Sequence, residues 1–543
     1  MKKISFLLVA MLVILTLSAW SGVEKDLFQN QEDYALGDNS RNPGRIRALA
    51  LGDVNGDGFG DVILGAPRAV AEGQADTGVV YIRFGLNFGP ESGYIDESWF
   101  DLSTSTSQTL DPTISAVNYP DGYGRLGGVQ INGELTQGRF GSSLASGDFD
   151  GDGIDDIAIG MAENLEPVGT GRVYVIRGRT DIEGLIELDE ERSNYRSFYI
   201  TGREEGDQFG EVLEFIDINN DGREDLVMGT PSGGEGGLVD IFYGRDFPSF
   251  FSQGVDSLPD PHSIIGSEGE NDAFGSSFAS GDFTGDGLVD MAVGAPEHSG
   301  TASFAGKTYL FEGTPSEFIP FPRGTLDLAV TTMTLKISSS VLLEQSGKSL
   351  ACGDFNGDGL DDLAIGAPSW AQSDQTNQGK VYLFYNDGER FQISNGFLPL
   401  SQADISFASL FSNQRFGTRI AFMDFDNYSS DDLVITSPYS SPDGRTSAGE
   451  AWIVFGRSLD QAYTDPIYYM QWESNLGVYI QGQYSGDFFG SELEAGNFNG
   501  DLSEDVFFTG NAGINLDGKS AWGLFGSPSY QRLAAGQSWN LYE

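Results

Sequence analysis

The sequence contains very little cysteine, histidine and basic charge. Its single cysteine, Cys352, excludes an internal disulfide, so an exported form of the chain would need another cross-link, such as bound metal ions. The two histidines, His262 and His298, have no nucleophile motif beside them, and the chain therefore shows no sign of a histidine-dependent triad. The formal charge of −50, from 30 basic and 80 acidic residues, disfavours nucleic acids and anionic membranes as partners.

Long apolar runs are also scarce. One run, at residues 4–17, follows two lysines, and small residues at 19–21 offer a cleavage site, which is typical of an export signal. We therefore expect a signal peptide at residues 1–21 and no membrane span after its removal, although the run would also suit an uncleaved anchor. The predicted location is secreted, extracellular or at the cell surface, with the periplasm as a further option.

What the chain has instead is glycine and a short acidic loop that recurs seven times. The best copies of the loop read DVNGDGFGD, DFDGDGIDD, DFTGDGLVD and DFNGDGLDD. The loops occupy residues 53–61, 148–156, 217–225, 282–290, 354–362, 424–432 and 497–505. Self-similarity at a nearly fixed spacing predicts one repeat architecture that fills most of the chain.

Each repeat contains four short apolar segments. In the second repeat they read FGSSLASGD before the loop, DIAIGMA after it, then GRVYVIRG and FYITG. Four antiparallel strands make a sheet with two apolar faces, and seven such sheets closed in a ring cover one another. A linear stack would need polar caps that the sequence lacks. We therefore predict an all-β fold, a seven-bladed β-propeller of four-stranded antiparallel blades, over residues 22–543. We expect residues 26–36 either to supply the missing strand of the ring or to pair with the last blade near residues 539–542.

Two flanking signatures identify a family resemblance. The dipeptide Phe-Gly at 140–141, 209–210, 274–275, 416–417 and 489–490, and the tripeptide Gly-Ala-Pro starting at 65, 294 and 366, resemble FG-GAP repeats. The resemblance implies the propeller headpiece of integrin α subunits. Some copies depart from it: Arg45-Ile46 and Ser346-Gly347 stand where Phe-Gly belongs, and the last two repeats have TSP and TGN for Gly-Ala-Pro.

The loops also predict metal sites. Side-chain oxygens at loop positions 1, 3, 5 and 9, with a backbone carbonyl at position 7, are a ligand set for Ca²⁺, and the glycine permits the sharp turn. An EF-hand would need a glutamate at position 12, where the first loop has Leu64, and flanking helices. The resemblance likewise implies strand-loop-strand calcium sites with a structural role.

The copies differ in quality, and we expect about five calcium sites with a possible sixth in the seventh loop. The seventh loop has Leu502 in place of glycine, and the sixth has Tyr428 at position 5, so we expect weak binding in the former and a vacant site in the latter. The predicted metal ligands are Asp53, Asn55, Asp57, Asp61, Asp148, Asp150, Asp152, Asp156, Asp217, Asn219, Asp221, Asp225, Asp282, Thr284, Asp286, Asp290, Asp354, Asn356, Asp358, Asp362, Asn497, Asn499, Asp501 and Asp505.

Strand alternation places the metal loops on one face of the ring. The loops between the second and third strands therefore lie on the opposite face, and the resemblance implies that partners bind there. Candidate contact residues on this face are Glu163, His298, Trp370 and Tyr439, although packing against neighbouring loops would explain the two aromatic residues equally well.

Two functions remain open from the sequence. The one that we favour is a secreted calcium-binding module, without enzymatic activity, for adhesion to an extracellular protein or glycan. The alternative is a polysaccharide-degrading enzyme, a lyase or hydrolase with its site in the propeller channel. With 80 acidic residues, paired carboxylates cannot identify such a site from the sequence. Because propellers host many functions, the preference for adhesion depends on the resemblance.

Overall fold

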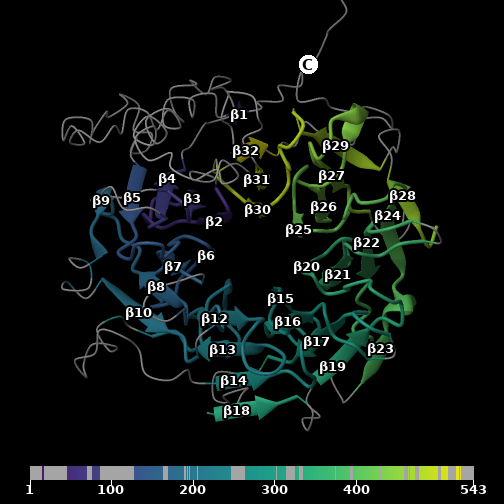
Figure 1. Cartoon of the computed structure of the whole chain (residues 1–543), viewed down its shortest axis with the longest axis horizontal. Coiled ribbons are helices and arrows are strands. Elements are labelled where there is room, and N and C mark those ends of the chain that lie inside the picture. Colours follow the sequence, from purple (N-terminus) through teal and green to yellow (C-terminus); the bar gives the residue numbers. More distant parts are fainter. Residues whose placement is uncertain are drawn as a thin grey trace, which may run out of the picture.

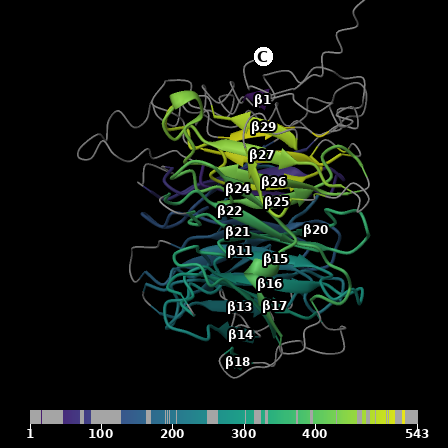
Figure 2. The same ribbon diagram turned by 90° about the vertical axis from the view of Figure 1, so that its right-hand side faces the viewer.

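The computed structural model contains seven β-sheets arranged as blades around a central axis (Figure 1). The predicted seven-bladed propeller is therefore confirmed. In the view turned by 90°, the strands run across the thickness of the ring (Figure 2). The structure describes residues 15–16, 46–69, 76–85, 128–162, 169–188, 191, 194, 196–204, 206–245, 247, 263–300, 302–313, 324–328, 334–372, 375–391, 396–428, 430–457, 463, 465–470, 476–482, 484–498, 500, 503–510, 521–524 and 526.

Each blade begins with an innermost strand and continues outward. The first three blades contain β2 (Ala48–Gly52), β3 (Asp61–Ala66), β4 (Val79–Arg83) and β5 (Gly128–Asn132); β6 (Leu144–Gly147), β7 (Asp156–Gly160), β8 (Arg172–Ile176) and β10 (Ser197–Thr201); and β11 (Val212–Ile216), β12 (Asp225–Thr230), β13 (Leu238–Phe242) and β14 (Ser263–Gly266).

The next three blades follow the same order. They contain β15 (Phe278–Gly281), β16 (Asp290–Ala295), β17 (Lys307–Phe311) and β19 (Thr334–Ser338); β20 (Ser349–Gly353), β21 (Asp362–Ala367), β22 (Lys380–Phe384) and β24 (Ile405–Ser409); and β25 (Ile420–Met423), β26 (Asp432–Ser437), β27 (Glu450–Val454) and β29 (Gly477–Gln481). Two 3-10 turns, η4 (Leu400–Gln402) and η5 (Pro442–Gly444), lie in the connections.

The seventh blade is completed from the other end of the chain. It contains β30 (Leu493–Gly496), β31 (Asp505–Thr509) and β32 (Ala521–Leu524), and β1 (Leu15–Thr16) pairs antiparallel with β32 as its fourth strand. The closing strand thus comes from within the predicted signal segment, and cleavage after residue 21 would remove it. The segments that we expected to close the ring, residues 26–36 and 539–542, lie outside the described residues.

Four blades have a fifth strand that the repeat pattern does not predict. In each case the connection between the third and fourth strands of one blade reaches back and pairs in parallel with the outer strand of the preceding blade. These strands are β9 (Gly184–Ile186) on β5, β18 (Gly324–Asp327) on β14, β23 (Phe397–Pro399) on β19 and β28 (Tyr468–Met470) on β24. They cover outer edges that would otherwise expose unpaired backbone groups.

The core lies between blades rather than within one. For example, Phe149 and Phe198 of the second blade pack with Phe215 and Phe247 of the third, and all four side chains are buried. The second strand of most blades is buried along its whole length, because neighbouring blades cover both of its faces. Within the described residues, no helix is long and apolar enough to cross a bilayer.

The Phe-Gly signature fixes the approach of one blade to the next. Gly171, with φ of +82°, lies so close to the backbone of the following blade that a Cβ atom there would be 2.5 Å from the carbonyl oxygen of Phe209. Any side chain at this position would force the two blades apart. The glycine that leads the third strand is therefore a packing requirement of the ring.

Candidate metal centres and axial site

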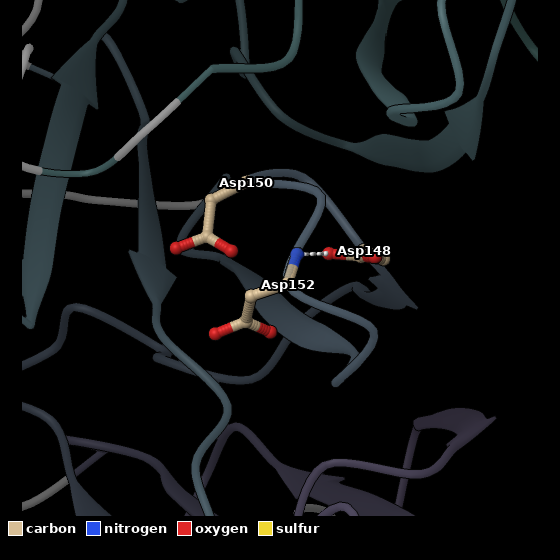
Figure 3. A group of neighbouring side chains, drawn as sticks. All are labelled: Asp148, Asp150 and Asp152. Carbon is tan, nitrogen blue, oxygen red and sulfur yellow. Dashed lines mark hydrogen bonds between the residues drawn. The ribbon is translucent and has the colours of Figure 1, made fainter.

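The first aspartate of each well-formed loop organises the turn. In the second loop Asp148 Oδ1 accepts hydrogen bonds from the amides of Gly151 (2.8 Å) and Asp152 (3.0 Å), and its Oδ2 accepts from Gly153 (2.8 Å). This turn brings ligand atoms of Asp148, Asp150 and Asp152 within 4.8 Å of one another (Figure 3). Three carboxylates at that separation can share one hard cation.

The ninth loop residue is an aspartate in all seven copies, and the third strand holds it in place. One of its oxygens accepts a backbone hydrogen bond of 2.7–3.0 Å from the residue two positions after the end of this strand. In Asp156, Asp225, Asp362 and also Asp432 of the sixth loop, the second oxygen, Oδ2, is buried and accepts no hydrogen bond from a described residue. A buried carboxylate oxygen without a donor fits a cation ligand.

The electrostatics of these aspartates point the same way. Burial raises the pKa of Asp61, Asp225 and Asp362 to about 8 each, and the neighbouring loop carboxylates raise it further, while the strand amide lowers it. A bound divalent cation would compensate both burial and like-charge repulsion, because it favours the ionised carboxylates. The residues present therefore fit a hard divalent cation.

The copies differ in ways that bear on their predicted quality. Tyr428 of the sixth loop is 56% exposed, and its aromatic ring offers no short oxygen ligand at position 5. In the second loop Arg177 pairs with Asp150 and with Asp152, each at 2.7 Å, which the sequence did not lead us to expect. This cation would compete with a metal ion for the two carboxylates. Asn499, Asp501 and Leu502 of the seventh loop lie outside the described residues.

The loops also join the blades to one another. In five interfaces the acid at loop position 8 reaches the preceding blade and accepts a hydrogen bond of 2.8–3.0 Å from the backbone amide of that blade's first loop residue. We call these carboxylates the blade latches: Asp155, Glu224, Asp361, Asp431 and Glu504. At Gly147 a Cβ atom would lie 1.9 Å from Glu224 Oε2, so the glycine before the loop leaves room for the latch.

A second group of charged residues lies at the ring axis. Three residues before each loop, on the innermost strands, five blades have alanine and two have glutamate. The glutamates are Glu214 on β11 and Glu494 on β30, and the alanines are Ala50, Ala145, Ala279, Ala351 and Ala421. The sequence analysis missed both glutamates, although aligning the seven repeats would have revealed them.

The charge of one glutamate acts on the other across the axis. They belong to the third and seventh blades, which are not neighbours, yet the charge of Glu214 raises the pKa of Glu494. Burial is the larger cause and raises the pKa of Glu494 well above its usual range, while Arg419 lowers it. Desolvation by the surrounding strands raises the pKa of Glu214 to about 7, and Glu224 raises it further, although water reaches the Glu214 side chain. Raised carboxyl pKa values of this kind are typical of acid–base sites.

Basic residues gather at one end of the same axis. Arg47, Lys348 and Arg419 lie five or six residues before their loops, where the inner strands begin, at the end opposite the metal loops. Arg419 Nε pairs with Glu492 Oε2 at 2.7 Å. Burial and then the charge of Arg419 lower the pKa of Lys348, which the charges of Glu211, Glu297 and Glu492 oppose. The glutamate pair and these residues together form what we call the axial cluster.

The predicted partner-face residues have different environments. His298 is buried, with Nδ1 2.9 Å from Asp272 Oδ2. Trp370 is also buried, and the amino group of Lys380 lies 5.1 Å from its ring centroid. Tyr439 is 41% exposed and packs edge-on against Phe488 at 5.4 Å. Glu163 lies outside the described residues. A role in partner binding stays a prediction for these residues.

Comparison with known families gives one match. The model of the FG-GAP repeat matches residues 46–82, 140–176, 274–311 and 346–384. These segments are the first, second, fourth and fifth blades, and each runs from the Phe-Gly position to the third strand.

Comparison with curated proteins gives two groups of relatives. Phosphatidylinositol-glycan-specific phospholipase D from Bos taurus is 24% identical over 402 residues, which are 72% of this chain and 43% of that protein. Integrin alpha-5 from Xenopus laevis is 30% identical over 234 residues, 42% of this chain and 20% of that protein. The chain thus spans less than half the length of these relatives. Among solved structures, the exotype rhamnogalacturonan lyase YesX is 12% identical to this chain, with a TM-score of 0.34. The match covers 91% of this chain and 78% of the lyase chain.

These matches correct the function favoured from the sequence. Phospholipases of the same name from four further organisms also match, at 28–32% identity, so enzymes stand among the relatives beside the integrins. The expectation of a non-enzymatic adhesion module is therefore wrong. It failed because the Phe-Gly and Gly-Ala-Pro signatures report how the blades pack, and such packing is common to integrins and enzymes.

Proposed function

We propose, from the premise that this chain is an FG-GAP repeat protein with an integrin α-like propeller, that it is a glycan-cleaving enzyme whose site is the axial cluster. The observation that carries this proposal is the pair Glu214 and Glu494, placed across the axis at a position where the other five blades have alanine. The enzymes among the relatives support a catalytic function, and the word glycan in their name supports a sugar-containing substrate.

The two glutamates would divide the work of acid and base. Burial and the charge of Glu214 raise the pKa of Glu494 well above its usual range, which favours its protonated form, and we assign it as the general acid that protonates the leaving oxygen. Glu214, with a pKa of about 7, is ionised at slightly alkaline pH and is the base or nucleophile on the other side of the bond. Arg419 forms an ion pair with Glu492 near the two glutamates, and this pair helps to keep the charges around them in place.

We propose that calcium holds the scaffold around this site. The first five loops would bind Ca²⁺, the seventh more weakly and the sixth not at all, with ligands at positions 1, 3, 5 and 9. Extracellular calcium is plentiful enough for weak sites, with Kd values of about 10⁻⁴–10⁻³ M. This agrees with export of the chain, which we propose from the apolar run at residues 4–17.

A second candidate is the reaction named by the phospholipase relatives, cleavage of a phosphatidylinositol glycan. Their 24–32% identity to this chain favours it. The basic residues of the axial cluster would suit the phosphodiester of such a substrate as well as they suit a sugar acid. The two candidates differ in the bond that breaks.

The test is a turnover screen of the full chain with calcium present. Purified protein is incubated with a panel of neutral and acidic polysaccharides and, in parallel, with a glycosylphosphatidylinositol-anchored protein. We expect new reducing ends from at least one polysaccharide. Release of the anchored protein instead would support the second candidate.

The control is the double variant Glu214→Gln and Glu494→Gln, which keeps the shape of both side chains. If wild type and double variant are equally inactive on every substrate while both remain folded, the enzyme proposal fails. Equal activity of the wild type and the double variant on a glycan would show that the catalytic site lies outside the axial cluster.

A further inference from the structure

The end of the ring axis opposite the metal loops carries a concentration of basic residues. The chain has only 30 lysines and arginines against 80 acids, so basic residues are uncommon on its surface. Nevertheless Arg47, Lys348 and Arg419 each stand immediately before an inner strand, β2, β20 and β25 respectively. Burial lowers the pKa of Arg47, and Arg68, two residues after the end of β3, lowers it further.

These basic side chains repel one another. Burial is the main cause that lowers the pKa of Arg47 and of Lys348; Arg68 lowers that of Arg47 further, and Arg419 lowers that of Lys348 further. The charge of Glu492 opposes the shift at both residues, so the acids at this end offset part of the repulsion.

Internal ion pairs explain only part of the arrangement. Arg419 is paired with Glu492 at 2.7 Å. No ion pair joins Lys348 to another residue in the described part of the chain, and the residue is only partly buried. Glu211 and Glu297 contribute to the potential at Lys348 without forming such a pair. Lys348 is thus available to an external anion.

Four of the equivalent positions at this end carry small hydroxyl side chains, and the third blade has Glu211 there. Six residues before the loops of the second, fourth, sixth and seventh blades stand Ser142, Ser276, Thr418 and Ser491. The positions at this opening of the axis therefore combine cations and hydroxyls with the acids Glu211 and Glu492, and the axial glutamates lie three or two residues further along the inner strands. Hydroxyls and amines are the groups that bind sugar rings and their acidic substituents.

We propose that the axial cluster takes an anionic polysaccharide, one that carries carboxylate or sulfate groups, and that Lys348 and Arg47 bind those groups beside the glutamate pair. This inference rests on the proposed glycan-cleaving function and names its substrate class. The formal charge of −50 does not oppose it, since salt screens distant charges beyond about 8 Å while the basic residues contact the substrate directly.

The test is direct binding to a protein that cannot turn the substrate over. Calorimetric titrations of the Glu494→Gln variant, in calcium and at constant ionic strength, compare a uronic-acid oligosaccharide, a sulfated galactan oligosaccharide and a neutral oligosaccharide of equal length. We expect at least one acidic ligand to bind about 10-fold or more tightly than the neutral one. Comparing the two acidic ligands identifies carboxylate or sulfate as the recognised group.

Adding Lys348→Met to this variant removes one cation, and Arg457→Met is the matched control. Arg457 lies over Tyr463, 4.3 Å from its ring centroid, just after β27, at the end of the ring that carries the metal loops. Loss of a charge-assisted hydrogen bond predicts about 10-fold weaker binding of the acidic ligand to the Lys348→Met protein and unchanged binding to the control.

Two results would overturn the inference. Neutral and acidic oligosaccharides could bind equally well, or Lys348→Met could bind the acidic ligand as tightly as the control does. In either case, turnover of a neutral polysaccharide by the wild-type chain would leave the glycan-cleaving function intact and reject only the substrate class. Absence of binding and of turnover with every glycan would reject both.

Discussion

The metal loops and the axial cluster lie on the same strands, yet they follow opposite rules. Position 9 of the loop is aspartate in all seven blades, and in each it accepts the same backbone hydrogen bond from the third strand. At the axis, by contrast, the sevenfold pattern is broken: glutamate replaces alanine in two blades, and basic residues appear at the opening in only a few.

This difference separates scaffold from function. A residue repeated in every blade serves what every blade needs, which is to hold its own strands and to join its neighbours. A substrate needs a particular arrangement of charges and does not need it seven times. The positions that break the repeat are therefore where chemistry specific to this chain is expected.

The largest effect is expected at the unique position Glu494. Glu494→Gln removes the proposed general acid while keeping the side-chain volume, and general acid–base catalysis contributes about 10²–10⁴-fold. We expect glycan turnover to fall by at least about 100-fold with little change in melting temperature. Ala421→Ser, at the equivalent position of the sixth blade, is the matched control and should retain activity. A Glu494→Gln protein with full activity would remove the acid–base pair from the mechanism.

The pH dependence of turnover should reflect the same pair. Because the pKa of Glu214 is about 7, protonation below that pH removes the base, and activity should fall about 10-fold per pH unit on the acid side. Deprotonation of Glu494, whose pKa burial raises well above its usual range, should cause the fall on the alkaline side. Glu214→Gln, which lacks the base, should lose most of its turnover at every pH. An optimum below pH 6 would contradict this assignment.

The repeated aspartates predict an effect on stability rather than on chemistry. Asp362 and Asp432 are a matched pair, since both are buried at position 9 and each accepts one strand amide, at 2.8 and 2.9 Å. Asp362 belongs to a loop with a full set of ligands, whereas Asp432 belongs to the loop with Tyr428. In 10 mM calcium, a site with a Kd of about 10⁻⁴–10⁻³ M contributes about 1–3 kcal/mol, so Asp362→Asn should lose that amount and Asp432→Asn should not.

Thermal unfolding with and without a chelator measures this difference. The chelator should lower the melting temperature of the wild-type chain by on the order of 10 °C if five sites contribute. It should also abolish the difference between the two variants. A wild-type melting temperature that does not respond to the chelator would show that the loops bind no stabilising cation.

The repeated features were predictable from the sequence because they are local. The spacing of Asp148, Asp150, Asp152 and Asp156 within nine residues fixes one turn whatever the surroundings, and the seven copies fix the number of blades. The four strands follow from short apolar segments between glycines. These signals required no knowledge of which blades face one another.

The unique features were not predictable because they depend on contacts between distant residues. The back-reaching strand β9 has the sequence GLI, which carries no strand periodicity and is extended only because β5 offers an edge. Glu214 and Glu494 are 280 residues apart and meet only when the ring closes. The closing strand β1 lies in a segment whose apolar run is equally typical of an export signal.

The smallest predicted effect concerns the blade latches, where the repeat itself is incomplete. Glu224 Oε2 accepts the amide of Asp148 at 2.9 Å, but the corresponding residue of the fourth blade is Val289, whose own amide donates to Asn220 Oδ1 at 2.9 Å instead. Glu224→Ala should leave the Asp148 amide without its acceptor and lower the free energy of unfolding by about 1–2 kcal/mol. Glu235→Ala, on an exposed loop, is the control and should change it by less than about 0.5 kcal/mol. Chemical denaturation in saturating calcium measures both. If the wild type and Glu224→Ala are equally stable, the apolar core holds the blades together without this latch. The ring could then lose any single latch without loss of stability.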